Sequence, residues 1–327
     1  MKVVAIGGGT GLSSLLRGIK NLVPDKISDL SAIVTVSDNG GSSGKLREEL
    51  RIPAPGDIRN CIAALAEDED ILTQVFQYRF KKGEGLKGHS FGNLFLTVLT
   101  QITGSFLEAI ETTSDILKIK GKIIPSTEEE VDLMARFTDG KIIKGETQIT
   151  EYGKKLVAKI EKIWLEPEFP KAPEDAIEKI ENADLIILGP GSLFTSVIPN
   201  LLIPEIRNAT VASKAKKLYI SNVMTQFGET DNFKVSDHIN AIHKAVGMEF
   251  INMVIANTRI PSKNTIEKYK KENAEPVLLD EENINKMGIK IFAEQLLEEG
   301  KFARHNPYKL TKLIENIIDM VQEEVHV

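Results

Sequence analysis

The chain alternates short apolar runs with polar or glycine-rich turns, and longer stretches between them carry apolar residues at helical spacing. Apolar runs of about four to eight residues bounded by turns are typical of buried strands. The runs that fit are residues 3–6, 31–36, 184–188, 217–222, 250–257 and 289–292. Because early and late runs both end in glycine loops, we predict a mainly parallel sheet with a ligand crevice at the strand ends.

The pattern changes between residues 116 and 150, where short β-like pieces are separated by turns such as Asp139-Gly140 and Gly145. Closely spaced turn signals favour antiparallel strands. We therefore predict a small antiparallel β insertion or lid at about 116–150, carried by a single domain that covers residues 1–327.

A last helix is predicted at about 308–324, because its apolar residues fall on one stripe. The stripe consists of Leu310, Leu313, Ile314, Ile317, Ile318 and Val321. Docking of this amphipathic helix on the core is the default interpretation, and a dimer interface is the alternative.

Composition narrows the class of protein. Hydrophobic residues make up 42% of the 327 residues, which argues against disorder, and the net charge of −6 argues against general nucleic-acid binding. Cys61 is the only cysteine, so no internal disulfide forms and a reducing compartment fits. No apolar run approaches the ~18 residues of a membrane span, and the first strand follows Lys2 directly, which leaves no room for a signal peptide. We expect a cytoplasmic protein without a membrane span.

The turn after the first strand is the first candidate site. A strand that passes through glycines into a helix brings free backbone N–H groups and the positive end of a helix dipole to one point, which suits a phosphate. The spacing departs from both the dinucleotide fingerprint and the P-loop. The alternative is therefore a glycine turn that merely connects the strand to the helix and binds no anion. The candidate ligand-binding residues are Gly8, Gly9, Thr10, Gly11, Leu12 and Ser13.

The turn after the second strand repeats this arrangement. Asp38 stands at the strand tip, where dinucleotide-binding folds place the acid that holds a ribose hydroxyl. The glycine- and serine-rich loop behind it is either a second anion nest or a flexible surface loop. Its candidate residues are Asn39, Gly40, Gly41, Ser42 and Ser43.

Three further polar residues are candidates for chemistry. Asp57 is placed to cap a helix that begins at Ile58, although Arg59 beside it also allows an ion pair. His89 is a candidate general base or phosphate contact, but a lone histidine is more often structural. Asn93 is as easily a helix cap as a ligand contact.

Late in the chain, a buried strand again runs into a glycine turn. The candidate residues there are Gly189, Pro190, Gly191 and Ser192, and Asn222 ends the following strand.

Five motifs, taken in order, resemble the superfamily of 2-phospho-L-lactate transferase (CofD-like) proteins. They are residues 7–11, 37–44, 55–60, 88–93 and 189–193. Residues 222–226 and 228–230 are similar to a narrower branch, the gluconeogenesis factor (YvcK-like) family. The resemblance covers nearly the whole chain and implies a Rossmann-like, three-layer α/β fold whose crevice holds a nucleotide.

For the gluconeogenesis factor branch, the resemblance implies binding of a UDP-sugar such as UDP-N-acetylglucosamine and a role in carbon-source-dependent cell shape and wall synthesis. The transferase has an asparagine-proline motif where this chain has Gly191-Ser192-Leu193, which argues against transferase activity. Some relatives carry a kinase-targeted threonine where this chain has Pro307, so that regulation is not expected here.

The leading hypothesis is a regulatory protein that binds a UDP-sugar, with the diphosphate at the first and late glycine loops and Arg304 reaching it from the C-terminal segment. The alternative is a nucleotide-using phosphoryl or nucleotidyl transferase, in which Asp38 or Asp57 holds Mg²⁺ and His89 assists proton transfer. A third possibility is an interaction platform with a structural nucleotide. Protein partners in cell-wall synthesis and a homo-oligomer are further expectations.

Overall fold

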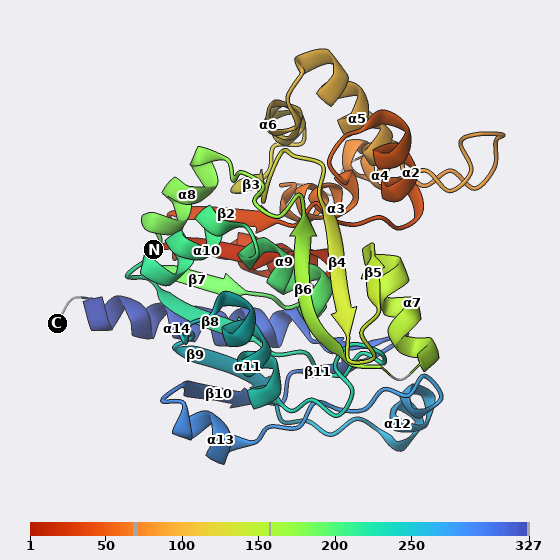
Figure 1. The fold of residues 1–327 in the computed structure, drawn as a ribbon. Helices are drawn as coiled ribbons and strands as arrows, with labels where there is room; N and C mark the ends of the chain where they lie inside the picture. Colours follow the sequence, from red (N-terminus) through yellow and green to blue (C-terminus); the bar gives the residue numbers. More distant parts are fainter. Residues whose placement is uncertain (68–70, 157, 326–327) are drawn as a thin grey trace.

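The computed structural model describes residues 1–67, 71–156 and 158–325. Its centre is a seven-stranded sheet in the order β10-β9-β8-β7-β1-β2-β3, and all neighbouring strands in it are parallel (Figure 1). The strands are β1 (Lys2–Gly7), β2 (Asp29–Val34), β3 (Lys122–Pro125), β7 (Leu185–Leu188), β8 (Lys216–Ile220), β9 (Met253–Asn257) and β10 (Lys290–Glu294). The predicted α/β fold with a mainly parallel sheet is confirmed.

Helices cover both faces of this sheet and complete three layers (Figure 1). The helices of the first half are α1 (Gly9–Ile19), η1 (Lys20–Leu22), α2 (Gly41–Leu50), α3 (Pro55–Leu65), α4 (Ile71–Gln77), α5 (Phe91–Thr103) and α6 (Phe106–Ile116). Those of the second half are α8 (Glu174–Glu181), η2 (Leu193–Val197), α9 (Ile198–Leu201), α10 (Pro204–Ala212), α11 (Val235–Val246), α12 (Lys263–Lys270), α13 (Glu281–Lys286) and α14 (Pro307–Val325).

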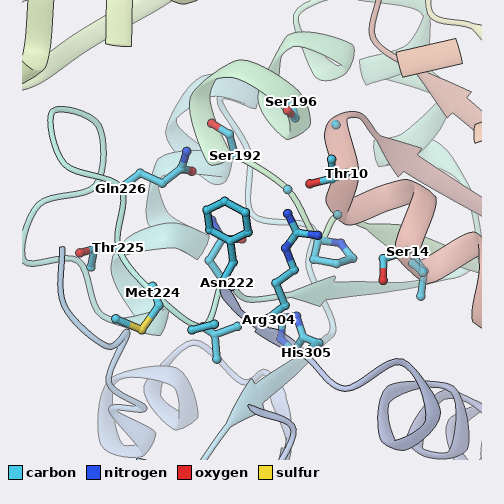
Figure 2. A pocket seen from close by; sticks show the side chains of 18 of the residues that line it. Thr10, Ser14, Ser192, Ser196, Asn222, Met224, Thr225, Gln226, Arg304 and His305 are labelled. Atoms are coloured by element: carbon cyan, nitrogen blue, oxygen red, sulfur yellow. The ribbon is translucent and has the colours of Figure 1, made fainter. Parts of the chain in front are cut away.

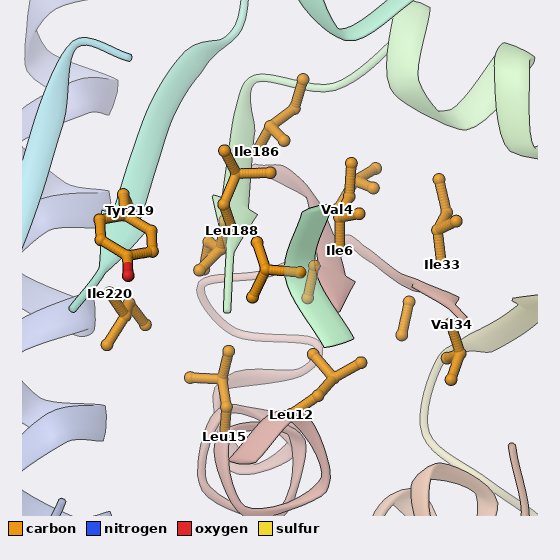
Figure 3. Close-up of a cluster of buried hydrophobic side chains, with 14 of the residues drawn as sticks. Val4, Ile6, Leu12, Leu15, Ile33, Val34, Ile186, Leu188, Tyr219 and Ile220 are labelled. Atoms are coloured by element: carbon orange, nitrogen blue, oxygen red, sulfur yellow. The ribbon is translucent and has the colours of Figure 1, made fainter. Parts of the chain in front are cut away.

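The core sits between β1, β7 and α1. Figure 3 shows the side chains of Ile6 and Leu188 packed near Leu12 and Leu15 of α1, and Ile6, Leu12 and Leu188 are completely buried. Each such side chain contributes about 1.5–3 kcal/mol when it leaves water. The core therefore fixes the start of α1 against the ends of the central strands.

The strand order reverses at the centre of the sheet. From β1 the chain moves outward to β2 and β3, and it later returns to β7 on the other side of β1. In open parallel sheets, ligands bind outside the carboxyl ends of the strands at this kind of reversal. The turns after β1 and β7 lie at this point.

The antiparallel insertion lies later in the chain than predicted. β4 (Asp132–Phe137), β5 (Ile142–Lys144) and β6 (Ile160–Glu166) form a three-stranded antiparallel sheet, with α7 (Glu146–Leu156) between β5 and β6. The prediction of 116–150 was wrong at its start, because β3 pairs in parallel with β2 and extends the main sheet. It ended too early, because β6 closes the small sheet.

Two local predictions are also corrected. Gly41, Ser42 and Ser43, which were predicted in a loop, form the first turn of helix α2. The helix expected from Ile58 begins at Pro55, since proline is favoured in the first turn of a helix, and Asp57 makes no side-chain cap for it.

At the C-terminus, α14 begins one residue before the predicted helix and packs against α1. Its stripe residues Leu310, Ile314 and Ile318 are buried, which confirms docking on the core. A short hairpin of β11 (Leu297–Glu299) and β12 (Ala303–His305) precedes α14. Within the described ranges, no helix has the length and apolarity needed to cross a bilayer.

Candidate functional site

A cavity of about 380 Å³ opens where β1, β7 and β8 end. We call it the glycine-loop cavity. Figure 2 shows Thr10, Ser192 and Arg304 pointing toward the same hollow from three separate segments. Its lining residues are Gly9, Thr10, Gly11, Ser14, Leu15, Pro190, Gly191, Ser192, Ser196, residues 222–226, Tyr269, Phe302, Ala303, Arg304, His305 and Leu310.

The lining of the glycine-loop cavity contains no aspartate or glutamate and one arginine. The Arg304 guanidinium lies 5.1 Å from the centre of the Phe302 ring. His305 is neutral at pH 7, because burial lowers its pKa to about 4. The formal charge of the lining is therefore positive and comes from Arg304.

Glycine is required at two points where the first and late loops meet. A Cβ on Gly11 would lie 2.4 Å from the carbonyl oxygen of Pro190, so a side chain there would push the two loops apart. Gly9 has a φ of +65°, which other residues adopt at a cost. The α1 N-terminus is thus held directly against Pro190 and Gly191, and its residues Gly9, Thr10 and Gly11 line the cavity.

Asp57 caps α1 instead of its own helix. Its Oδ2 accepts a hydrogen bond of 2.6 Å from the Gly9 amide. Burial, followed by the negative charge of Asp38, raises the pKa of Asp57 to about 6 against the opposing effects of the Gly9 amide and of Arg59. Asp57 therefore stands at the border of the cavity, next to a second acid.

Asp38 orders the turn that leads into α2. Its Oδ1 accepts a hydrogen bond of 2.8 Å from the Gly40 amide. A Cβ on Gly56 would lie 3.0 Å from Asp38 Oδ2 and 2.3 Å from Ser43 Oγ, so the start of α3 packs tightly against this turn. The turn after β2 is thus fixed beside Asp57 rather than free.

The predicted polar residues of the middle region form one buried network. Ser42 Oγ lies 3.1 Å from His89 Nδ1, and Asn93 Nδ2 donates to Ser42 Oγ at 3.2 Å and to Ser43 Oγ at 3.4 Å. Arg59 donates to Ser90 and Asn60 and makes no direct ion pair in the described chain. The contact with Ser42 gives His89 a structural role, because it holds the start of α2.

Two acids that the sequence analysis did not single out join Asp38 and Asp57. Burial raises the pKa of Glu146 well above its usual range, and the carboxylates of Asp38, Asp57 and Glu229 raise it further. Glu229 is itself buried, and burial also raises its pKa. We call Asp38, Asp57, Glu146 and Glu229 the carboxylate cluster.

Glu229 connects this cluster to the cavity and to the insertion. Its two oxygens accept hydrogen bonds of 2.8 Å each from Ser192 and from Thr150 of α7. The Ser192 hydroxyl also accepts a hydrogen bond of 2.7 Å from Thr195. The side chain of Ser192 is therefore engaged by protein, and a ligand meets mainly the backbone of this loop.

Helix α7 spans both halves of the crevice. At its start, Asn39 accepts from the Thr147 amide at 3.1 Å and donates to Gln148 at 2.7 Å. At its other end, a Cβ on Gly153 would lie 2.1 Å from the carbonyl oxygen of Gly228. The insertion is thus docked on the turn after β2 and on the loop that carries Glu229.

Some predicted residues take other positions. Leu12 is fully buried in the core, and Ser13 donates to the Thr10 carbonyl, while Ser14 lines the cavity. Across residues 1–67, 71–156 and 158–325, no group of three or more His, Cys, Asp or Glu side chains has the geometry to hold a metal ion. Magnesium binding by Asp38 and Asp57 therefore stays a prediction.

The comparisons with known proteins cover nearly the whole chain. Residues 3–297 match the family model of 2-phospho-L-lactate transferase CofD. A relative from Aquifex aeolicus is 59% identical over 320 residues, which are 98% of this chain and 97% of that protein. The gluconeogenesis factor of Bacillus subtilis is 43% identical over 323 residues, 98% of each chain.

A solved structure supports the same assignment. The crystal structure of a Bacillus halodurans protein has a TM-score of 0.91 and 44% identity, and it covers 96% of this chain and 98% of that one. A second structure of that protein describes it as a member of the UPF0052 family. The chain therefore belongs to the CofD family and, within it, to the gluconeogenesis factors.

Proposed function

We propose that this protein binds a UDP-sugar, such as UDP-N-acetylglucosamine, in its crevice and acts as a cytoplasmic regulator. The observation that carries the proposal is the division of the crevice into an acid-free cavity with one arginine and an adjoining carboxylate cluster. A nucleotide sugar has two corresponding parts: an anionic diphosphate, which suits the cavity, and a sugar whose hydroxyls donate hydrogen bonds, which suits the carboxylate cluster.

The diphosphate fits the glycine-loop cavity. The N-terminus of α1 and the Arg304 guanidinium favour an anion, because helix N-termini and arginine both bind phosphate oxygens. The Gly9 amide is already bonded to Asp57, so the later residues of this turn would meet the phosphate. Tyr269 and Phe302 line the same cavity and offer ring faces on which the uracil can stack.

The sugar fits the carboxylate cluster. Carboxyl oxygens accept hydrogen bonds, and sugar hydroxyls donate them. Asp38 uses Oδ1 for the Gly40 amide, which leaves Oδ2 as the acceptor beside Gly56. In this proposal, Asp38 binds ligand and takes part in no reaction.

The regulatory part of the proposal rests on α7. This helix contacts the turn after β2 through Asn39. Its Thr150 bonds to Glu229, which in turn bonds to Ser192 of the late glycine loop. A ligand that moves either loop therefore also acts on the insertion. The name of the gluconeogenesis factor family supports gluconeogenic growth as the process. We extend the proposal to cell shape and wall synthesis as the output and to a wall-synthesis protein as the partner.

Calorimetry with a panel of UDP-N-acetylglucosamine, UDP, GDP and NAD tests the ligand choice. We expect the UDP-sugar to bind most tightly, and at a hundredfold excess over its dissociation constant to stabilise the protein by ~2.7 kcal/mol. Strong binding of NAD or GDP, with no binding of UDP-sugars, would contradict the proposal.

A second candidate, an Mg²⁺-dependent transferase, follows from the same carboxylate cluster. Burial raises the pKa of Asp57 and Glu146, and repulsion from neighbouring acids raises both further. A cation relieves that repulsion, and carboxylates together with substrate phosphates are ordinary Mg²⁺ ligands. Incubation with UDP-N-acetylglucosamine and Mg²⁺, followed by chromatography, separates the two functions. A product that forms with the wild type and disappears in Asp38→Asn would establish the transferase.

A further inference from the structure

His305 of β12 lies beside Arg304 in the lining of the glycine-loop cavity (Figure 2). Its Nε2 atom is out of contact with solvent and has no hydrogen-bond partner among the described residues. Burying a polar atom without a partner is costly, and native structures rarely do so. At the wall of a cavity, such an atom marks a place for a ligand group.

The contacts of the ring make Nε2 a hydrogen-bond acceptor. Burial lowers the pKa of His305, and a hydrogen bond to the backbone of Ser221 opposes this effect, which identifies the partner as the carbonyl group. Since Nε2 has no partner in the described chain, the nitrogen that donates to Ser221 is Nδ1. A neutral imidazole carries a single N–H group, so Nε2 has a free lone pair and accepts.

Within a UDP-sugar, an acceptor in this cavity meets the nucleoside. The diphosphate offers no donor at neutral pH, and the sugar lies at the carboxylate cluster in the proposed function. The donors that remain are the N3–H group of uracil and the ribose hydroxyls.

The neighbours of His305 favour the base over the ribose. Tyr269 and Phe302 line the same cavity. The Tyr269 hydroxyl accepts a hydrogen bond of 2.8 Å from the Ala303 amide, which holds α12 against the strand that carries His305. Proteins read a base by stacking on its faces and by hydrogen bonds to its Watson–Crick edge, and this part of the cavity offers both.

We propose that His305 selects uracil over cytosine by accepting a hydrogen bond from N3–H of the base. The two bases have nearly the same size but differ at this edge, because N3 carries a hydrogen in uracil and a lone pair in cytosine. With cytosine, the lone pair of N3 would face that of Nε2, and neither would be paired. The inference rests on the proposed function, because it names the residue that recognises the uridine part of that ligand.

Gln226 is the other candidate for base selection in this lining. Its Oε1 is also buried and has no partner within the described ranges. A side-chain amide can turn over and present either its oxygen or its NH₂ group, so Gln226 can pair with either base. His305 lacks this freedom, because its bond to Ser221 fixes which nitrogen carries the hydrogen.

Calorimetric titration of the full chain with UDP and with CDP tests the proposal. The wild type is expected to bind UDP about 10- to 100-fold more tightly than CDP. In His305→Asn, the amide nitrogen takes the approximate place of Nδ1 and can still donate to Ser221, whereas the acceptor at Nε2 is lost. This variant is expected to bind UDP and CDP with nearly equal affinity, and thermal unfolding checks that it is folded.

His238→Asn is the matched control. His238 Nδ1 lies 2.9 Å from the Lys234 carbonyl oxygen, and its buried Nε2 also has no partner in the described part of the chain, but His238 does not line the cavity. This variant should keep the wild-type ratio of the two affinities. Equal affinities in the wild type, or an unchanged ratio in His305→Asn, overturn the proposal. A ratio that falls only in Gln226→Ala also overturns it and assigns the choice of base to Gln226.

Modified ligands give a second measurement that needs no variant. N3-methyl-UDP lacks the donor and is expected to bind the wild type no more tightly than CDP, whereas 2′-deoxy-UDP keeps the donor and should bind much as UDP does. If N3-methyl-UDP binds as tightly as UDP and 2′-deoxy-UDP binds weakly, the cavity reads the ribose and the proposal fails.

Titration of the wild type with UDP-N-acetylglucosamine separates this inference from the proposed function. A wild type that binds the UDP-sugar but does not prefer UDP over CDP overturns the role of His305 alone. A wild type that binds no uridine nucleotide overturns the proposed function as well.

Discussion

The glycine-loop cavity and the carboxylate cluster adjoin each other at the same end of the sheet and have opposite electrostatic character. The cavity has no acid in its lining and one arginine, whereas the cluster gathers four acids from separate elements. Two hydrogen bonds connect them, from Gly9 to Asp57 and from Ser192 to Glu229. One crevice therefore offers an anion site and a hydroxyl-acceptor site side by side.

The electrostatic difference arises from the backbone in the glycine-loop cavity and from side chains in the carboxylate cluster. The cavity depends on glycines that let α1 approach the late loop. A Cβ added to Gly11 would lie only 2.4 Å from the Pro190 carbonyl oxygen, so no larger residue fits there. The cluster depends on α7, which brings Glu146 and Thr150 over the crevice and against Glu229. Changes in the two regions should therefore have separable effects on the two ends of a ligand.

The largest effect is expected from Gly9→Val. Gly9 has a φ of +65° and a Cβ there would lie 3.4 Å from Ser196 Oγ, so valine strains the turn and narrows the anion site. We expect UDP-sugar affinity to fall at least ~100-fold, or about 2.7 kcal/mol, with the fold retained. Gly288→Val is the control, because Gly288 has a φ of +70° with nothing within 4 Å. Equal affinity in Gly9→Val and Gly288→Val removes the opening turn from the site.

Arg304→Ala tests the positive charge of the cavity. Loss of a charged hydrogen bond to phosphate should weaken binding of both UDP and the UDP-sugar by about 1.5–3 kcal/mol, and added salt should reduce the difference. Lys301→Ala is the matched control, since Lys301 also lies over the Phe302 ring but does not line the cavity. If the two variants titrate alike in calorimetry, Arg304 has no special role.

Asp38→Asn tests the acceptor side. The change keeps the shape and an acceptor for the Gly40 amide but removes the charge. Binding of UDP-N-acetylglucosamine should weaken by about 1–3 kcal/mol, the scale of a charge-assisted hydrogen bond, while UDP alone should bind as before. A loss that is the same for UDP and for the UDP-sugar would place Asp38 away from the sugar.

The smallest effect concerns stability and Asp57. Its pKa is about 6 in the folded protein, against 3.8 as the ordinary value. Ionisation of Asp57 therefore destabilises the folded protein; this cost is absent below about pH 4 and grows to its full size as the pH rises above about 6. Asp57→Asn removes this cost and should raise the free energy of unfolding by about 1–2 kcal/mol at about pH 8, with no difference near pH 4. Urea unfolding at both pH values checks this. A destabilised variant at the higher pH would mean that the ionised carboxylate is net favourable as the α1 cap.

The sequence predicted the sheet and the cavity well because both depend on local patterns. Apolar runs gave the central strands, and the turns after β1 and β7 meet as expected, since ends of parallel strands share one edge. The helix α2 was missed because Gly41, Ser42 and Ser43 are typical loop residues. Its first turn is held by Asn93, which lies far along the chain.

The carboxylate cluster could be predicted only in part. Asp38 and Asp57 follow recognisable turns, but Glu146 and Glu229 resemble solvated acids in sequence. Glu229 becomes buried and Glu146 partly buried where α7 packs closely against the loop of Glu229, so that Gly153 touches Gly228, a contact between two distant segments. The motif at residues 228–230 was the one sequence signal at Glu229, and it did not indicate burial.

The central claim is that the diphosphate lies in the glycine-loop cavity and the sugar at the carboxylate cluster. The most direct test is a crystal structure of the protein with UDP-N-acetylglucosamine. We expect phosphate oxygens at the N-terminus of α1 and against the Arg304 guanidinium, with a sugar hydroxyl donating to Asp38. A ligand bound in the opposite direction, or outside the crevice, would contradict it.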